Sequence, residues 1–210
     1  MKVSVYTGRG ASMAKDVMSA LKKLNIEFDT INENKILLNK INCKILIFPG
    51  GWPQKYSFNL GESGFEKIRR FVRNGGRYIG ICAGSDFALK RFEIEKANFL
   101  GIGLIDGIGK LEVNKILPGR IRTIKLDSNH SLSRNCPNEM KIWYQNGPVF
   151  KQNKDVEVVA KYENDNIAIA SSKYGKGHVI LFSPHPEGNL KNKIDPVKYG
   201  TINLLKNALV

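Results

Sequence analysis

Cys82 stands at the centre of a short segment whose residue types suit a nucleophile. Residues 80–84 read Gly-Ile-Cys-Ala-Gly, and the pattern predicts a buried strand running into them and a helix leaving them. Small neighbours permit a tight strand-to-helix turn that exposes the central side chain at the carboxyl end of a sheet. A helix N-terminus also favours the thiolate, the nucleophilic form. On this segment alone, a buried structural cysteine is an equally good interpretation.

A second segment supplies groups that can activate a thiol. His185 and Glu187 follow the apolar residues 178–182, and a proline stands on each side of the histidine. A cysteine nucleophile needs a base, and the base needs a carboxylate that orients it. Taken alone, a His-Pro-Glu sequence fits a solvated turn. Together with Cys82, it predicts a Cys-His-Glu triad.

A third segment, residues 48–51, reads Phe-Pro-Gly-Gly and ends another apolar strand. Consecutive glycines allow backbone N–H groups to turn toward a reacting carbonyl. Gly50 and Gly51, together with the N–H of Ala83, are therefore candidates for an oxyanion hole. The alternative is a plain turn at the end of a strand.

The elements that must position these segments alternate in the first half of the chain. Strands are expected at residues 2–7, 28–31, 44–48 and 77–81, and helices at 12–24, 64–73 and from 83 to about 92. Ser12 is the expected N-cap of the first helix. This alternation predicts a parallel sheet with right-handed crossovers. Open α/β sheets place their ligand sites at the carboxyl ends of the strands, where Cys82 is expected.

Beyond residue 99 the pattern changes to short alternating segments separated by turn residues. They cover residues 111–113, 120–126, 141–144, 156–162, 167–171 and 178–182, and a closing helix is expected at 197–209. Such segments predict antiparallel strands added to the sheet. With no repeat and no linker, we expect residues 1–210 to form one α/β domain. Its sheet would be doubly wound and mostly parallel, with antiparallel additions in the C-terminal half.

Composition excludes several classes of protein. There is no signal-peptide pattern and no apolar stretch long enough to span a bilayer, so we expect a soluble, cytoplasmic protein without membrane partners. Three unevenly spaced cysteines argue against a disulfide framework, and no Cys/His spacing suits a structural metal. Gly8 and Gly10 lack the third glycine of a dinucleotide fingerprint, because Met13 occupies that position. We expect neither a metal nor a cofactor.

The formal net charge of +14 raises the possibility of nucleic-acid binding. The lysines are scattered among many asparagines and isoleucines, with no basic run and no recognition-helix pattern. We therefore expect no specific nucleic-acid partner.

The motifs together resemble the class I glutamine amidotransferase superfamily, which has a flavodoxin-like fold. More narrowly, the chain is similar to the branch related to the N-terminal domain of biotin-protein ligase, and the resemblance covers nearly the whole chain. No ligase domain follows, so a stand-alone version is expected. The matching segments are residues 5–8 (Val-Tyr-Thr-Gly), 48–51, 80–84, 144–148 (Tyr-Gln-Asn-Gly-Pro), 174–178 (Tyr-Gly-Lys-Gly-His) and 184–187 (Pro-His-Pro-Glu).

The resemblance implies a role for each matching residue. Cys82 would be the nucleophile, His185 the general base and acid, and Glu187 the residue that orients the histidine. Gly51 and Ala83 would form the oxyanion hole. The remaining implied positions contact the substrate: Gly50, Tyr144, Gln145 and Asn146.

Two positions depart from related patterns. Glutaminases often have Gln four residues after the nucleophile, whereas this chain has Asp86, which would hold an ammonium group well. Glutamine is therefore doubtful as the substrate, although hydrolysis of a related amide fits. Ala83 replaces the histidine that follows the nucleophile in the protease-like branch, which argues against that branch.

The sequence is compatible with two functions. One is a thiol-dependent amide hydrolase or amidotransferase that passes ammonia to a synthetase partner chain. The other is a non-catalytic binding or regulatory module that keeps the amidotransferase fold. The complete set of Cys82, His185 and Glu187 favours the enzyme.

Overall fold

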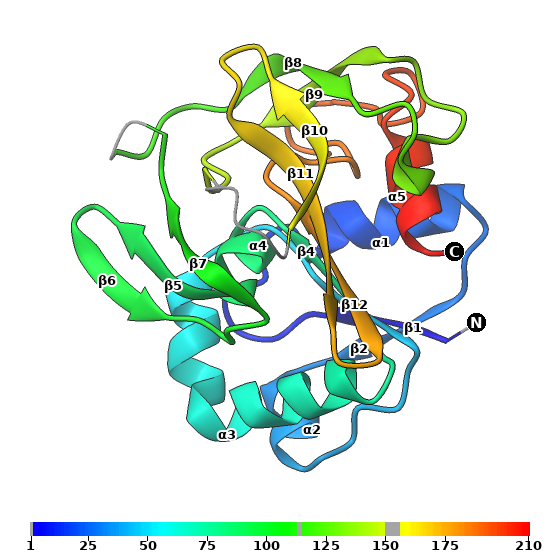
Figure 1. Cartoon of the computed structure of the whole chain (residues 1–210). Coiled ribbons are helices and arrows are strands. Elements are labelled where there is room, and N and C mark those ends of the chain that lie inside the picture. The colour runs from blue at the N-terminus through cyan, green and yellow to red at the C-terminus, as the bar shows by residue number, and fades with distance from the viewer. Residues whose placement is uncertain (1, 113–114, 150–155) are drawn as a thin grey trace.

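The computed structural model describes residues 2–112, 115–149 and 156–210, and within them the strands form two sheets (Figure 1). The larger sheet has the strand order β2-β1-β3-β4-β12-β11-β10-β8-β9, and the smaller has the order β6-β5-β7. The strands of the larger sheet are β1 (Val3–Tyr6), β2 (Phe28–Ile31), β3 (Ile45–Phe48), β4 (Arg77–Ile81), β8 (Arg120–Leu126), β9 (Glu139–Tyr144), β10 (Glu157–Tyr162), β11 (Ile167–Tyr174) and β12 (Gly177–Phe182). Those of the smaller sheet are β5 (Leu89–Ile94), β6 (Ala97–Leu100) and β7 (Ile105–Lys110).

The larger sheet has a parallel half and an antiparallel half. Strands β2, β1, β3, β4 and β12 run parallel to one another. Strands β11, β10, β8 and β9 continue the sheet in antiparallel pairs. This mixed α/β sheet confirms the fold class predicted from the sequence.

Helices cover both faces of the parallel half (Figure 1). Helices α1 and α5 contribute to one core cluster, and α2, α3 and α4 contribute to the other. In β3, Ile45 and Ile47 face the first cluster, whereas Leu46 and Phe48 face the second, which explains the unbroken apolar run. The helices are α1 (Ala14–Lys23), α2 (Glu33–Leu37), α3 (Pro53–Arg73), α4 (Ala83–Ala88) and α5 (Ile202–Ala208), with a 3₁₀ turn at Ser131–Ser133.

The prediction of a helix from residue 83 to about 92 is wrong in its second half. Helix α4 ends at Ala88, and Leu89 begins β5. Strands β5 and β6 form a hairpin in which Phe92 stacks on Phe99, with ring centroids 5.3 Å apart. Glu95 and Lys96 make its turn, both with positive φ, the backbone geometry that matches the twist of a tight hairpin. Cross-strand packing therefore prevails over the helical spacing of the sequence.

The ends of three other helices differ from the predictions. Ser12 is not an N-cap, because α1 begins after Met13 and has no side-chain cap. Helix α3 begins at Pro53, eleven positions before the predicted start at residue 64 and with a kink at Gly61. Helix α5 is shorter than the predicted 197–209, because the chain first makes turns in which Ile202 N–H donates to the carbonyl of Pro196.

The direction of β12 was also predicted wrongly. This strand lies between β11 and β4, antiparallel to the first and parallel to the second. Of the strand expected at residues 111–113, Val113 lies outside the described residues, and Leu111 and Glu112 follow β7 without joining it. No helix in the described ranges is long and apolar enough to cross a membrane.

Candidate active site

Cys82 occupies a sharp turn at the carboxyl end of β4. Its backbone has φ 51° and ψ −110°, a conformation that L-residues rarely adopt, and helix α4 begins at the next residue. Glycine is required beside it, because a Cβ at Gly84 would overlap the carbonyl oxygen of Phe48. Strain of this kind is commonly retained at functional positions. The chain thus passes directly from strand to helix at Cys82, as predicted for residues 80–84.

His185 and Glu187 lie beside this turn because β12 is the neighbour of β4. The parallel register pairs Phe182 with Ile81, so the two strands end side by side. The backbone N–H of Cys82 donates to the carbonyl of Phe182 at 2.7 Å, and that of His185 donates to the carbonyl of Trp143 at 2.8 Å. These bonds fix both loops to the sheet.

The His185 ring and the Glu187 carboxylate form a buried pair. Nδ1 of His185 lies 2.8 Å from Oε1 of Glu187, as expected for a residue that orients the base. Burial opposes protonation of His185, but the charges of Glu187 and Cys82 prevail and raise its pKa well above the usual value. Burial raises the pKa of Glu187, while the charge of His185 opposes that rise.

The thiol of Cys82 interacts with two neighbouring residues, His185 and Gln145. It lies close enough to His185 to raise the pKa of the imidazole by charge and by hydrogen bonding. Sγ also lies 3.3 Å from the carbonyl oxygen of Gln145, to which the thiol donates. Nε2 of His185 is buried and has no well-aligned hydrogen-bond partner among the described residues. This looseness is typical of catalytic groups in a ligand-free site.

The glycine turn after β3 completes this edge of the sheet. A Cβ at Gly50 would come within 2.8 Å of Cε1 of His185, so the glycine lets the ring pack against the backbone. Gly51 has φ 151° and, like Ala83, lines the cavity in front of Cys82. Within the described chain, neither the Gly51 N–H nor the Ala83 N–H donates a backbone hydrogen bond. Both N–H groups are therefore without a backbone acceptor in the described part of the chain.

The cavity in front of Cys82 has a volume of about 240 Å³, and several predicted site residues border it. Gln145 and Asn146 line it, but the Asn146 side-chain amide exchanges two hydrogen bonds with the backbone of Leu117, each 2.8 Å long. Tyr144 does not line the cavity, and its hydroxyl donates to the carbonyl of Gly147. Six apolar lining residues were not predicted from the sequence, and of these only Trp52 and Pro53, next to the glycine turn, had a sequence signal. The six are Met13, Trp52, Pro53, Ile94, Leu111 and Ile116.

Asp86 also faces this cavity. It is only 4% exposed, and burial raises the pKa of its carboxyl well above the usual range. Its Oδ1 atom lies against β7, because a Cβ at Gly109 would overlap it. No group of three or more His, Cys, Asp or Glu side chains suited to a metal ion occurs in the described parts of the chain.

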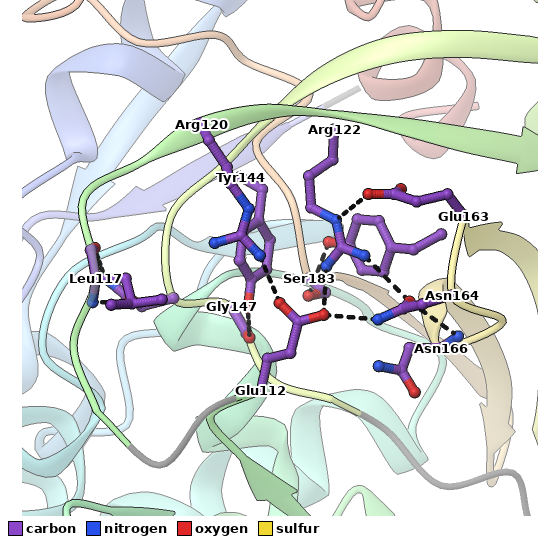
Figure 2. Close-up of polar contacts among 12 residues, drawn as sticks. Glu112, Leu117, Arg120, Arg122, Tyr144, Gly147, Glu163, Asn164, Asn166 and Ser183 are labelled. Carbon is purple, nitrogen blue, oxygen red and sulfur yellow. Dashed lines mark hydrogen bonds and ion pairs between the residues drawn. The ribbon is translucent and has the colours of Figure 1, made fainter.

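A buried arginine cluster supports the two loops that border the cavity. The side chain of Arg122 is 3% exposed and binds Glu112, Glu163 and Asn164 at 2.9–3.1 Å (Figure 2). Its guanidinium lies 3.9 Å from the ring centroid of Tyr162, whose hydroxyl donates to Ser183.

The same guanidinium lies 5.2 Å from the ring centroid of Tyr144. Tyr144 leads into Gln145, and Ser183 leads into His185. The cluster therefore supports both the loop that carries Gln145 and the loop that carries His185.

Comparisons with known proteins agree with this fold. A solved glutamine amidotransferase has a TM-score of 0.72 to this chain with 21% identity, and the match covers 99% of each chain. The structure of PurLQS from Thermotoga maritima has a TM-score of 0.73 with 17% identity, and covers 99% of this chain and 97% of that one. The fold is therefore that of the class I glutamine amidotransferase-like proteins, as the sequence predicted.

Within this class, the chain belongs to the family described as "Biotin-protein ligase, N terminal", whose model matches residues 1–102 and 118–206. It is 29% identical to the biotin–protein ligase of Schizosaccharomyces pombe over 214 aligned residues, which cover 89% of this chain. The match covers 33% of that relative, so the chain spans about a third of its length.

Proposed function

We propose that this chain is a thiol-dependent hydrolase or amidotransferase that acts on an amide with Cys82, His185 and Glu187. The observation that carries the proposal is the pairing of β4 with β12. Because these strands are parallel neighbours, the strained cysteine and the buried His–Glu pair leave the sheet at the same edge. A structural role alone would not require a strained nucleophile, a base and an orienting carboxylate together.

In the acylation step, His185 Nε2 takes the thiol proton and Sγ of Cys82 attacks the carbonyl carbon of the amide. A C–S bond forms, and the carbonyl oxygen becomes an oxyanion that accepts hydrogen bonds from the N–H groups of Gly51 and Ala83. The C–N bond then breaks. His185 gives its proton to the leaving nitrogen, and a thioester remains on Cys82.

In the second step, His185 takes a proton from water, and the water oxygen attacks the thioester carbonyl. The C–S bond breaks, a carboxylic acid leaves, and the proton returns to Sγ. Glu187 stays ionised throughout and stabilises the imidazolium that forms in each step. In an amidotransferase the released ammonia would pass to an acceptor, and a synthetase partner chain is the natural one.

The substrate is assigned to the cavity in front of Cys82. Gln145 and Asn146 line this cavity, whereas Gly50 lies outside its lining and lets the His185 ring pack against the backbone. We assign Tyr144 a supporting role, because its hydroxyl holds the carbonyl of Gly147 and so shapes the loop.

One observation favours a second candidate, a binding module without turnover. The thiol of Cys82 donates to the carbonyl of Gln145, and His185 Nε2 makes no well-aligned bond within the described residues. A module that keeps this arrangement when its ligand binds would not ionise the thiol through His185. Reactivity of the thiol therefore separates the two candidates.

The test is alkylation with limiting iodoacetamide, followed by intact mass and peptide mapping. Burial raises the pKa of both Cys43 and Cys136, which slows their reaction. We expect Cys82 to be labelled first in the wild type and roughly a hundredfold more slowly in His185→Ala. The matched control Cys136→Ser should leave the Cys82 rate unchanged. Labelling of Cys43 or Cys136 before Cys82 would sink the proposal in favour of the binding module.

A chloroketone analogue of glutamine then tests whether glutamine is the substrate. Rapid labelling of Cys82 by this reagent would support glutamine. If iodoacetamide labels Cys82 rapidly but the chloroketone labels it only slowly, the nucleophile stands and glutamine is excluded.

A further inference from the structure

The Asp86 carboxylate is buried, borders the cavity in front of Cys82 and has no polar partner among the described residues. Within the described residues it makes no hydrogen bond and no ion pair, although it is only 4% exposed. An unpaired buried carboxylate is costly, and native proteins retain such a group mainly where a ligand or a reaction uses it. The side chain cannot turn away easily, because it is confined against Gly109.

The charged residues that line the cavity indicate which charge the ligand carries. The chain has 33 lysines and arginines, yet none of those in the described ranges lines the cavity. The nearest lysine along β7, Lys110, pairs with Glu93 at 2.9 Å, and Lys55 lies over the ring of Trp52 outside the lining. A free carboxylate on the ligand would find no cation here, whereas an ammonium group would find Asp86.

We propose that Asp86 binds a cationic amine, so that the acyl compound presented to Cys82 carries an ammonium group near its reacting carbonyl and has no free carboxylate. The inference rests on the proposed function, because it places the acyl group of this ligand at Cys82. The cavity of about 240 Å³ is smaller than a typical drug-sized pocket of roughly 300–1,000 Å³, so the ligand is a small amine-bearing amide or ester.

The first test compares three methanethiosulfonate reagents of similar size: the cationic 2-aminoethyl, the neutral ethyl and the anionic 2-sulfonatoethyl compound. Each forms a mixed disulfide with a thiolate and releases methanesulfinate. The rate at Cys82 is divided by the rate of the same reagent with 2-mercaptoethanol, which removes intrinsic differences. Burial keeps Asp86 protonated when no cation is bound, and a neighbouring ammonium group favours its ionised form. We therefore expect the cationic reagent to be favoured roughly tenfold over the neutral one, and the anionic one to be disfavoured.

Two variants show whether Asp86 causes the preference. Asp86→Asn should bring the three normalised rates together. Asp165→Asn removes the same charge from an exposed turn and should keep the full preference. Equal normalised rates in the wild type, or a preference that survives in Asp86→Asn, would overturn the inference and leave the nucleophile untouched. Failure of the neutral reagent to label Cys82 would instead remove the proposed function.

A second measurement does not depend on the thiol. Butylammonium should raise the thermal midpoint of the wild-type protein, and butyrate and butyramide should not. The shift should disappear in Asp86→Asn and persist in Asp165→Asn. If butyramide raises the midpoint as much as butylammonium does, Asp86 acts as a neutral hydrogen-bonding group and the proposed charge recognition is wrong.

Discussion

Nδ1 of His185 lies 2.8 Å from Oε1 of Glu187, and neither side chain is accessible to solvent. The contact fixes the ring so that Nε2 is the nitrogen available to Cys82. It also places a carboxylate where it stabilises the imidazolium in a medium that screens charge poorly. The pKa of His185 is raised chiefly because this stabilisation exceeds the effect of burial.

Glu187→Gln should lower the pKa of His185, because the amide keeps the shape of the carboxylate and removes its charge. The imidazolium then titrates at lower pH, and the rate of Cys82 acylation at near-neutral pH should fall roughly a hundredfold. The His185 Cε1–H resonance, followed by NMR against pH, reports the shift directly. Glu27→Gln, at an exposed carboxylate, is the matched control and should change neither quantity. An unchanged His185 titration in Glu187→Gln would contradict the charge argument.

Arg122→Ala should destabilise the fold by about 3–5 kcal/mol, because it leaves the half-buried Glu112 without its buried partner. The control is Arg120→Ala, which also removes a contact to Glu112 but from a side chain that is 43% exposed. Exposed ion pairs contribute little, so its loss should be about 1 kcal/mol or less. Urea unfolding of both variants measures the difference, and equal losses would mean that the buried cluster does not brace the loops.

Gly147→Ala should displace the loop that carries Gln145. A Cβ at Gly147 would overlap the carbonyl oxygen of Ser183, so either the loop or the end of β12 must move. We expect slower iodoacetamide labelling of Cys82 and a lower thermal midpoint. Gly107→Ala is the control, because its Cβ would meet only Leu89 at an ordinary distance of 3.7 Å. Wild-type labelling in Gly147→Ala would show that the contact does not set the position of the loop.

Asp86→Asn should stabilise the protein most at neutral and alkaline pH. The pKa of Asp86 is raised by burial, so above the ordinary Asp value of about 3.9 the unfolded chain releases a proton that the folded chain retains. Wild-type stability therefore falls as pH rises toward the folded pKa, by about 1.4 kcal/mol for each pH unit of that interval. The free energy of unfolding of Asp86→Asn does not fall in this way, because asparagine does not ionise. Urea unfolding at acidic and near-neutral pH tests the sign, and Asp165→Asn, which keeps Asp86, should retain the pH dependence of the wild type.

The sequence by itself determined which residues could react and the class of fold that carries them. Gly-Ile-Cys-Ala-Gly, Pro-Gly-Gly and His-Pro-Glu each follow an apolar run, and in an α/β chain such runs end at the ligand-binding edge of the sheet. The period-two apolar pattern also located most strands of the C-terminal half, including Arg120–Leu126, whose predicted bounds match β8. These features are local, so the order of residues along the chain is enough to reveal them.

Only the tertiary structure decided how these segments of the chain pack together. The place of β12 beside β4 depends on pairing between strands separated by about half the chain, and no periodicity reports such a pairing. The hairpin at Leu89 arises because cross-strand contacts outweigh helical spacing, and Arg122 acquires its partners from residues 112, 163 and 164. Whether Asp86 lies in solvent or unpaired in a cavity is likewise a matter of burial. Burial depends on everything packed around a side chain, so it is a property of the folded chain as a whole.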